Sequence, residues 1–201
     1  MVITKLTQGK KNKNRANVYL DGQYSFSISL DNLVSFSLKI GDTISEEKIS
    51  EIKNVEGYLR AYDRALTFIS YRKRSEKEVK DKLKSLEFEE DVVEKTMDRL
   101  KKNSFIDDVD FTLSWIINRN RLKPTSRKIL FTELYQKGIE KSIIENELAG
   151  ISNEEEVENA KKIVAKKIIS LKNDPEKIKK YLYSKGFSWD MIKKVVNDKE
   201  E

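Results

Sequence analysis

A six-residue pattern that occurs three times constrains this fold more than any other feature of the sequence. Two copies are closely similar and one is degenerate: Leu134-Tyr135-Gln136-Lys137-Gly138-Ile139, Leu182-Tyr183-Ser184-Lys185-Gly186-Phe187 and Leu83-Lys84-Ser85-Leu86-Glu87-Phe88. The copies lie about 50 residues apart, a period typical of stacked helical repeats. Each copy predicts the end of a helix, with a left-handed residue followed by an apolar residue that folds back onto the last turn.

The elements around this pattern recur in the same register. An N-cap candidate precedes each copy and an apolar pair follows it: Ser75, Ser126 and Asp174, then Val92-Val93, Ile143-Ile144 and Met191-Ile192. Glu87 stands where the other two copies have glycine. A residue other than glycine can adopt the left-handed conformation at a cost on the order of 1 kcal/mol. We therefore predict three copies of one helical unit, the first with an unusual turn.

The first 55 residues have a different pattern. Val2–Leu6 alternates apolar and polar residues, as a half-buried strand does. Val18–Ile28 predicts two strands joined at Asp21-Gly22, a dipeptide that suits a hairpin turn with positive φ at both positions. We expect Tyr24 and Phe26 to share one face of this hairpin and to pack against a short helix that follows.

The predicted fold class is all-α. It has three tandem three-helix repeats in an elongated, curved array, with a small N-terminal extension that contains the β-hairpin. The predicted boundaries are 1–55 for the extension and 56–103, 104–150 and 151–201 for the repeats. Helical periodicity runs from Ile44 to Arg74, and we expect Gly57 to interrupt it.

Composition excludes several kinds of chemistry. The chain of 201 residues contains no histidine and no cysteine, so thiol chemistry, disulfides, histidine bases and the commonest zinc ligands are absent. No phosphate-binding loop or nucleophile elbow occurs. The sequence shows no leader-like or membrane-spanning apolar run, so we expect a cytoplasmic protein. The net charge of +6 is compatible with a polyanionic partner or with a lysine-rich surface.

Several motifs, taken in order, resemble the RecX family of recombination regulators over essentially the full length. They are Arg72-x-Arg74-Ser75, Ile106-Asp107-Asp108-x-x-Phe111, Trp115, Arg119-x-Arg121, Glu133-Leu134-x-x-Lys137-Gly138-Ile139 and Lys185-Gly186-Phe187. The loop Lys10-Lys11-Asn12-Lys13-x-Arg15 and the hairpin after it are similar to the extension of Gram-positive-type members. None of these motifs is specific alone, but their order and spacing are.

The resemblance implies a binding function. Members of this family bind the RecA recombinase along the groove of its filament on single-stranded DNA and modulate, usually inhibit, its ATPase and strand exchange. The resemblance implies no catalytic centre and no cofactor, so we expect neither enzyme activity nor a bound metal. It leaves single-stranded or double-stranded DNA open as a second ligand, and we expect a monomer that does not bind membranes.

Basic clusters are the candidate contacts with the recombinase or with DNA. They comprise Lys10, Lys11, Lys13 and Arg15, then Arg72, Lys73 and Arg74, and finally Arg119, Arg121, Lys123, Arg127 and Lys128. Arginine is enriched in the last two clusters, and its fork matches carboxylates and phosphates. The competing interpretation is a solvated surface with ordinary internal ion pairs.

Two other readings of the whole chain remain open. One is a protein that binds single-stranded nucleic acid directly, and the other is a helical-repeat adaptor for an acidic protein partner. The adjacent acids Asp107 and Asp108 invite a catalytic interpretation, but two aspartates before a helix are typical of a cap and a favourable dipole charge.

Overall fold

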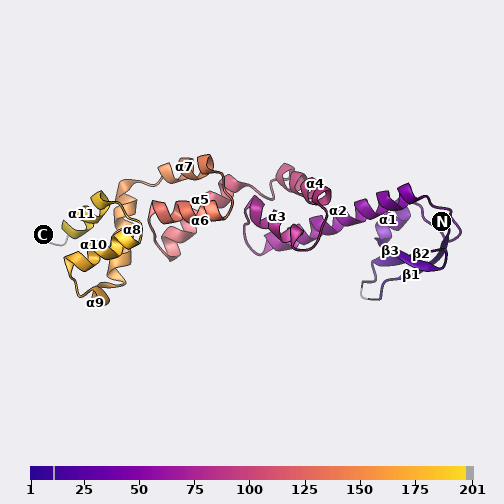
Figure 1. The fold of residues 1–201 in the computed structure, drawn as a ribbon, viewed down its shortest axis with the longest axis horizontal. Helices are drawn as coiled ribbons and strands as arrows, with labels where there is room; N and C mark the ends of the chain where they lie inside the picture. Colours follow the sequence, from indigo (N-terminus) through magenta and orange to yellow (C-terminus); the bar gives the residue numbers. More distant parts are fainter. Residues whose placement is uncertain (11, 198–201) are drawn as a thin grey trace. The chain divides into compact units, whose positions relative to one another are not determined.

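The computed structural model describes residues 1–10 and 12–197 (Figure 1). Two compact units are present. The first comprises Met1–Ser70 and Lys82–Leu100, and the second comprises Tyr71–Asp81 and the chain from Lys101 onward. Helices make up most of both units, and a small sheet lies at the N-terminal end of the first.

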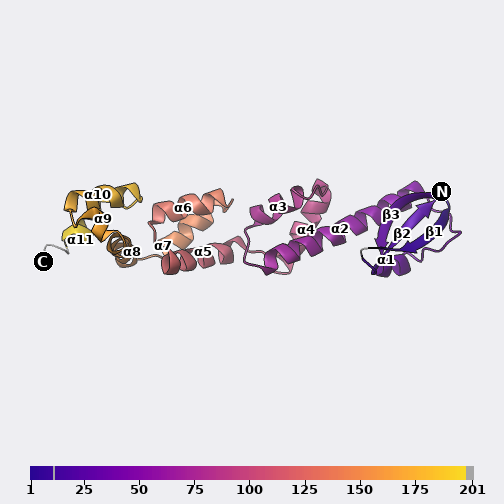
Figure 2. The same cartoon turned by 90° about the horizontal axis from the view of Figure 1, so that it is seen from below.

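The sheet of the first unit has three antiparallel strands in the order β1-β2-β3, which lie side by side in Figure 2. They are β1 (Ile3–Gln8), β2 (Arg15–Leu20) and β3 (Gln23–Ser29). Asp21 and Gly22, between β2 and β3, have φ values of 48° and 87°. Positive φ at both positions confirms the hairpin turn that the Asp-Gly dipeptide predicted.

One face of the sheet packs on the short helix α1 (Leu30–Ser35) and on the start of α2 (Glu46–Ser70). Phe26 is buried in this core, as predicted, but Tyr24 is exposed. The register between β2 and β3 shifts after Val18, where the sheet is irregular. Because such a shift changes which face a side chain occupies, the prediction that Tyr24 packs with Phe26 was wrong.

Helix α2 is continuous, so the expected interruption at Gly57 was also wrong. Glycine inside a helix costs about 1 kcal/mol relative to alanine, and the surrounding packing overrides that preference. The predicted boundary between residues 55 and 56 falls inside this helix. The N-terminal extension therefore shares a rigid element with the first repeat.

A buried carboxylate joins the sheet to α2. Glu56 accepts hydrogen bonds from the Arg15 guanidinium at 2.7 Å, the Ser29 amide and hydroxyl at 2.9 Å each, and the Asn32 amide group at 2.7 Å. Burial alone would raise the pKa of Glu56, but these hydrogen bonds outweigh it and lower the pKa below its ordinary value. The charge is therefore stabilised inside the first unit.

Three helices form each repeat. The first repeat uses the end of α2 with α3 (Glu76–Lys84) and α4 (Glu90–Lys102). The second uses α5 (Asp108–Leu122), α6 (Arg127–Gln136) and α7 (Lys141–Ala149). The third uses α8 (Asn153–Ala165), α10 (Pro175–Ser184) and α11 (Trp189–Asn197), with an unpredicted short helix α9 (Ile168–Leu171). The predicted all-α class, with three-helix repeats and a β-containing N-terminal extension, is confirmed.

The pattern that ends each middle helix has one geometry in all three repeats. Gly138 and Gly186 have φ values of 81° and 80°, and Glu87 has 60°. In each case the next amide bonds back to the carbonyl of the pattern's leucine, as Ile139 does to Leu134 at 3.2 Å. Leu134 and its two counterparts are fully buried. We call these three turns the helix stops.

The middle helices α3 and α6 begin against the helix stop of the following repeat. The Ser75 hydroxyl accepts from the Glu78 amide as an N-cap and donates to the Lys137 carbonyl at 2.7 Å. The Ser126 hydroxyl likewise donates to the Lys185 carbonyl at 2.7 Å. One serine therefore starts a helix and also satisfies a carbonyl at the end of another.

An acidic side chain completes each contact. The Asp108 carboxylate accepts from the Glu76 amide at 2.9 Å, and the Glu156 carboxylate accepts from the Arg127 amide at 3.1 Å. Both amides lie in the first turn of a helix and have no partner within it. Asp107 caps its own helix as predicted, whereas Asp108 caps α3 instead. Burial raises the pKa of Asp108, and the bond from Glu76 offsets part of that increase.

The contact also explains why two stops need glycine. A Cβ at Gly138 would lie 2.5 Å from the Lys77 Cβ, and one at Gly186 would lie 2.8 Å from the Ser126 hydroxyl oxygen. No repeat precedes the first, and the Glu87 side chain is exposed. The first stop therefore carries only the conformational strain of a side chain at positive φ, without a steric conflict.

We predict opposite effects of substitution at these stops. Gly138→Ala should lower the free energy of unfolding by about 1–2 kcal/mol, because it adds left-handed strain and a contact with Lys77. Glu87→Gly should raise it by less than about 1 kcal/mol, because relief of strain exceeds the entropy that glycine adds to the unfolded chain. Urea denaturation followed by circular dichroism measures both. Equal stability of Gly138→Ala and the unsubstituted chain would contradict the stop geometry.

Candidate functional site

Each repeat has a groove that runs along its first helix, close to the predicted basic clusters. The first groove lies in the first unit, and the second and third lie in the second unit. Their volumes are about 480, 430 and 460 Å³ respectively. Their linings are equivalent only in part: Arg60 and Arg64 of the first groove align with Phe111 and Trp115 of the second, but Asn12 and Arg15 come from the N-terminal extension.

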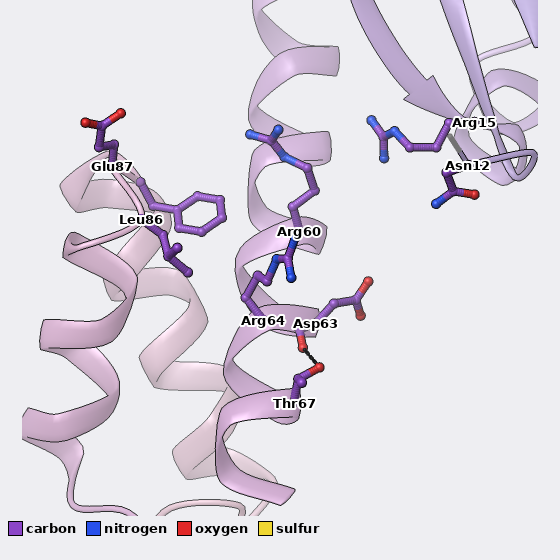
Figure 3. A pocket seen from close by; sticks show the side chains of 9 residues that line it. Asn12, Arg15, Arg60, Asp63, Arg64, Thr67, Leu86 and Glu87 are labelled. Carbon is purple, nitrogen blue, oxygen red and sulfur yellow. Dashed lines mark hydrogen bonds between the residues drawn. The ribbon is translucent and has the colours of Figure 1, made fainter. Parts of the chain in front are cut away.

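The first groove lies between α2, the first helix stop and the N-terminal loop (Figure 3). Arg60 and Arg64 project from α2, and Asn12 and Arg15 lie opposite them. The Arg60 guanidinium lies 5.7 Å from the centre of the Phe88 ring, a cation–π distance. Arg15 is committed to Glu56, whereas Arg60 and Arg64 are exposed. The groove is therefore lined by arginine on the helix side.

Of the N-terminal cluster, the structure places three members. Lys10 and Lys13 are exposed, and Arg15 is the half-buried partner of Glu56 at 2.7 Å. Lys11 lies outside the described residues. Arg15 thus has a structural partner inside the chain, while the two lysines form no ion pair with the residues that the structure describes.

The second groove has an apolar floor formed by Phe111 and Trp115, whose rings stack at 5.8 Å. Cations at its edge are paired internally. Arg72 holds Glu78 with two hydrogen bonds of 2.9 and 3.1 Å, and Lys73 bonds to Asp110 at 2.5 Å. The predicted cluster of basic residues before α3 is therefore built into the interface with the second repeat.

Glu78 also accepts from Lys137, at 2.5 Å, so one carboxylate holds two cations from different helices. Burial would raise the pKa of Glu78, but the hydrogen bonds and charges of Arg72 and Lys137 outweigh it. They lower the pKa to about 2. Half-buried Arg74 has its pKa lowered by burial and by the neighbouring charge of Arg72.

Arg119 is paired in the same way. Its guanidinium donates hydrogen bonds to both carboxylate oxygens of Glu133. Glu133 also accepts a hydrogen bond from the Trp115 indole nitrogen at 3.0 Å. Arg121 is exposed and lies 3.4 Å from the Asn118 amide oxygen. The planar fork of Arg119 thus fixes the orientation of α5 against α6.

Arg127 and Lys128 differ although they are neighbours. Arg127 pairs with Glu156 at 3.3 Å and also donates to the Ile151 carbonyl, so it belongs to the contact between the second and third repeats. Lys128 is exposed on the same helix. Predicted binding arginines are thus held by internal carboxylates at four positions: Arg15, Arg72, Arg119 and Arg127.

The third groove is lined by lysine. Lys123, Lys166, Lys167 and Lys185 are exposed along it, and its walls include Ile129, Ile163 and Tyr181. The Lys185 ammonium lies 5.5 Å from the centre of the Tyr181 ring. Of these four lysines only Lys123 was among the predicted site residues, and Arg119, which was also predicted, lines the groove as well.

Several basic residues that line the grooves lie outside the predicted clusters. These are Arg60 and Arg64 in the first groove and Lys166, Lys167 and Lys185 in the third. Aligning the repeats on their stops would have indicated Lys167, which occupies the position equivalent to Arg119. Arg60 and Arg64 gave no such signal, because they align with Phe111 and Trp115.

Other kinds of site have no support among the residues that the structure describes. No cluster of three or more acidic side chains there could hold a metal ion. None of the helices in residues 1–10 and 12–197 is long and apolar enough to cross a membrane. The grooves remain the candidate sites.

Comparison with known proteins identifies the fold and the family. The chain is 36% identical to the regulatory protein RecX of Clostridium botulinum (strain Alaska E43 / Type E3), over 98% of this chain and 95% of that protein. The chain belongs to the RecX family. It is also 35% identical to the regulatory protein RecX of Bacillus subtilis (strain 168), over 94% of this chain and 74% of that one.

RecX crystal structures have the same fold. One, described as regulatory protein RecX, is 31% identical with a TM-score of 0.75 and 98% coverage of both chains. RecX from Lactobacillus salivarius is 28% identical with a TM-score of 0.66, over 72% of this chain and 97% of that one.

The family's domain models divide the chain into similar parts. The RecX N-terminal domain matches residues 1–45, the first three-helix domain matches 61–100 and the third matches 154–196. The first interval contains the sheet and α1, and the other two begin on the first helix of a repeat. The matched intervals therefore overlap the first and third helical repeats.

We predict that Glu78 makes stability depend on pH. Its pKa is depressed, so its contribution is present above the ordinary value of 4.5 and is lost as pH falls toward about 2. Glu78→Gln should lower the melting temperature at pH 7, and the difference from the unsubstituted chain should shrink between pH 4.5 and pH 2.

The matched control is Glu145→Gln, which removes an exposed carboxylate that pairs with Lys141 at 3.4 Å within one helix. It should change the melting temperature little at any pH. A Glu78→Gln difference that stays constant from pH 7 to pH 2 would contradict the assignment of a depressed pKa.

Proposed function

We propose that this chain regulates a RecA-type recombinase by binding along the recombinase filament on single-stranded DNA and lowering its ATPase and strand-exchange activity. The observation that carries the proposal is the match, over nearly the whole chain, to proteins named regulatory protein RecX. A protein that acts on a DNA-bound recombinase works in the cytoplasm of a bacterium. We expect it to act as a monomer and without a cofactor.

The arrangement of charges supports binding through the grooves. Arginines that are fixed by internal carboxylates shape the repeats, so the exposed cations are the better candidates for contact with the filament. The two in the first groove, Arg60 and Arg64, form no ion pair with a carboxylate among residues 1–10 and 12–197, and their guanidinium groups suit acidic side chains of a protein. Lys10, Lys13 and Lys128 are further candidates on the surface.

Inhibition has a simple physical route. A protein that contacts several subunits of a filament through separate repeats gains affinity from each contact. Occupation of the filament groove would block the path of a second DNA strand. It would also favour the filament conformation to which the protein binds most tightly, which need not be the one that turns over ATP.

We predict that Arg60→Glu/Arg64→Glu weakens inhibition of a RecA filament on single-stranded DNA. The concentration for half-maximal inhibition of ATPase should rise about tenfold or more, equivalent to about 1.4 kcal/mol, because two attractive charges become repulsive. ATPase and strand exchange are measured with and without the protein, and co-sedimentation measures binding to the filament.

A control with the same net charge is Lys53→Glu/Lys102→Glu, which alters exposed lysines outside the grooves. It should inhibit like the unsubstituted chain, and circular dichroism should show that both variants are folded. No effect of the unsubstituted chain on ATPase, strand exchange or sedimentation would overturn the proposed function. Equal loss in the two variants would overturn the role of the first groove.

A further inference from the structure

The third groove lacks the carboxylates that pair with the cations of the second groove. In the second groove, Glu78 holds Arg72 and Lys137, and Glu133 holds Arg119. Aligned on the caps and stops, the third groove has Ile129 in place of Glu78 and Tyr181 in place of Glu133. The cations at the equivalent positions remain: Lys123, Lys185 and Lys167. The third groove therefore has the positive charges of the second groove but not the carboxylates that pair with them.

The result is a concentration of uncompensated charge. Four lysines line the third groove, and none of Lys123, Lys166, Lys167 and Lys185 has a carboxylate within ion-pair distance among residues 1–10 and 12–197. Ammonium groups that share a concave site repel one another, and low-dielectric walls strengthen the field inside it. An anionic ligand with several charged groups would relieve this repulsion.

We propose that the third groove binds the phosphates of a single-stranded nucleic acid. The free cations here are all lysines, whose compact charges on flexible stems suit phosphates in many orientations. Arg119, the arginine of this groove, is already committed to the bidentate contact that carboxylates favour. Ile129, Ile163 and Tyr181 give the walls apolar surface that unpaired bases can cover.

The other grooves are poorer candidates for a strand. The second groove is apolar at its floor, and three of its four cations, Arg72, Lys73 and Arg119, are paired; the fourth, Lys123, also lines the third groove. The first contains Asp63 beside its arginines. This inference extends the proposed function by giving one groove to DNA, but the binding requires no recombinase. It is tested with the protein and an oligonucleotide alone.

The test is fluorescence anisotropy of the full chain with a labelled oligothymidylate of about 20 nucleotides, over a range of salt concentrations. Each phosphate contact contributes about 0.7 to the slope of log affinity against log salt. Lys166→Gln/Lys167→Gln should reduce that slope by about 1.4. Lys102→Gln/Lys193→Gln, with the same net charge, should reduce it far less, because those lysines lie outside the groove.

A second pair of variants restores the missing acid without removing a lysine. Tyr181→Glu reproduces the carboxylate of Glu133 in the third groove and should weaken oligonucleotide binding severalfold. Tyr183→Glu adds the same charge at an exposed position of the same helix and should change binding much less. Thermal melts of each variant separate loss of binding from loss of folding.

Three results would overturn the inference. The unsubstituted chain could fail to bind the oligonucleotide, or both members of a variant pair could lose affinity equally, which would indicate a general charge effect. The third is displacement of the labelled oligonucleotide by poly-glutamate that is as effective as, or more effective than, unlabelled oligonucleotide at the same concentration of negative charge. That result would indicate that the groove binds an acidic protein. Inhibition of a recombinase that survives any of these results would leave the proposed function standing.

Discussion

The structure depends on how each middle helix ends. A left-handed residue turns the chain back, exposes the last carbonyl of the helix and leaves space for the helix start that packs there. Ser75 and Ser126 use this space, since each hydroxyl caps its own helix and donates to the carbonyl of Lys137 or Lys185. Because glycine at these stops has no side chain, the approach is close. Polar contacts therefore join the start of α3 to the second repeat and the start of α6 to the third.

The same junctions decide where positive charge remains available. Glu78 and Glu133 form ion pairs with the arginine and lysine side chains around them, so these cations help to hold the helices together. Where their counterparts are Ile129 and Tyr181, lysines line an open groove. Basic residues recur at equivalent positions along the sequence, but the grooves differ in how many of these residues are unpaired. The grooves of this chain therefore present different amounts of unpaired positive charge.

Local signals in the sequence predicted much of this fold. Caps, buried leucines, stops and the Asp21-Gly22 turn all depend on neighbours within a few residues, and the structure confirms them. Long-range pairings were beyond such signals. Three contacts depend on residues that only folding brings together. Asp108 caps another helix, Glu56 is buried against the sheet, and Arg72 is held by Glu78. The candidate clusters were chosen for their basic residues, and charge alone did not reveal which members pair with carboxylates of the same chain.

The interlock between repeats is tested most directly by native-state hydrogen exchange at the first amides of α3 and α6. The amides of Glu76 and Arg127 have no intrahelical acceptor, so they would exchange rapidly in an ordinary helix. Because Glu156 accepts from the Arg127 amide, that amide should be protected in the full chain and should lose about tenfold or more of its protection in Glu156→Ala. The Glu76 amide, held by Asp108, should be unchanged in that variant. Rapid exchange of the Arg127 amide in the unsubstituted chain, or protection that is indifferent to Glu156→Ala, would contradict the account.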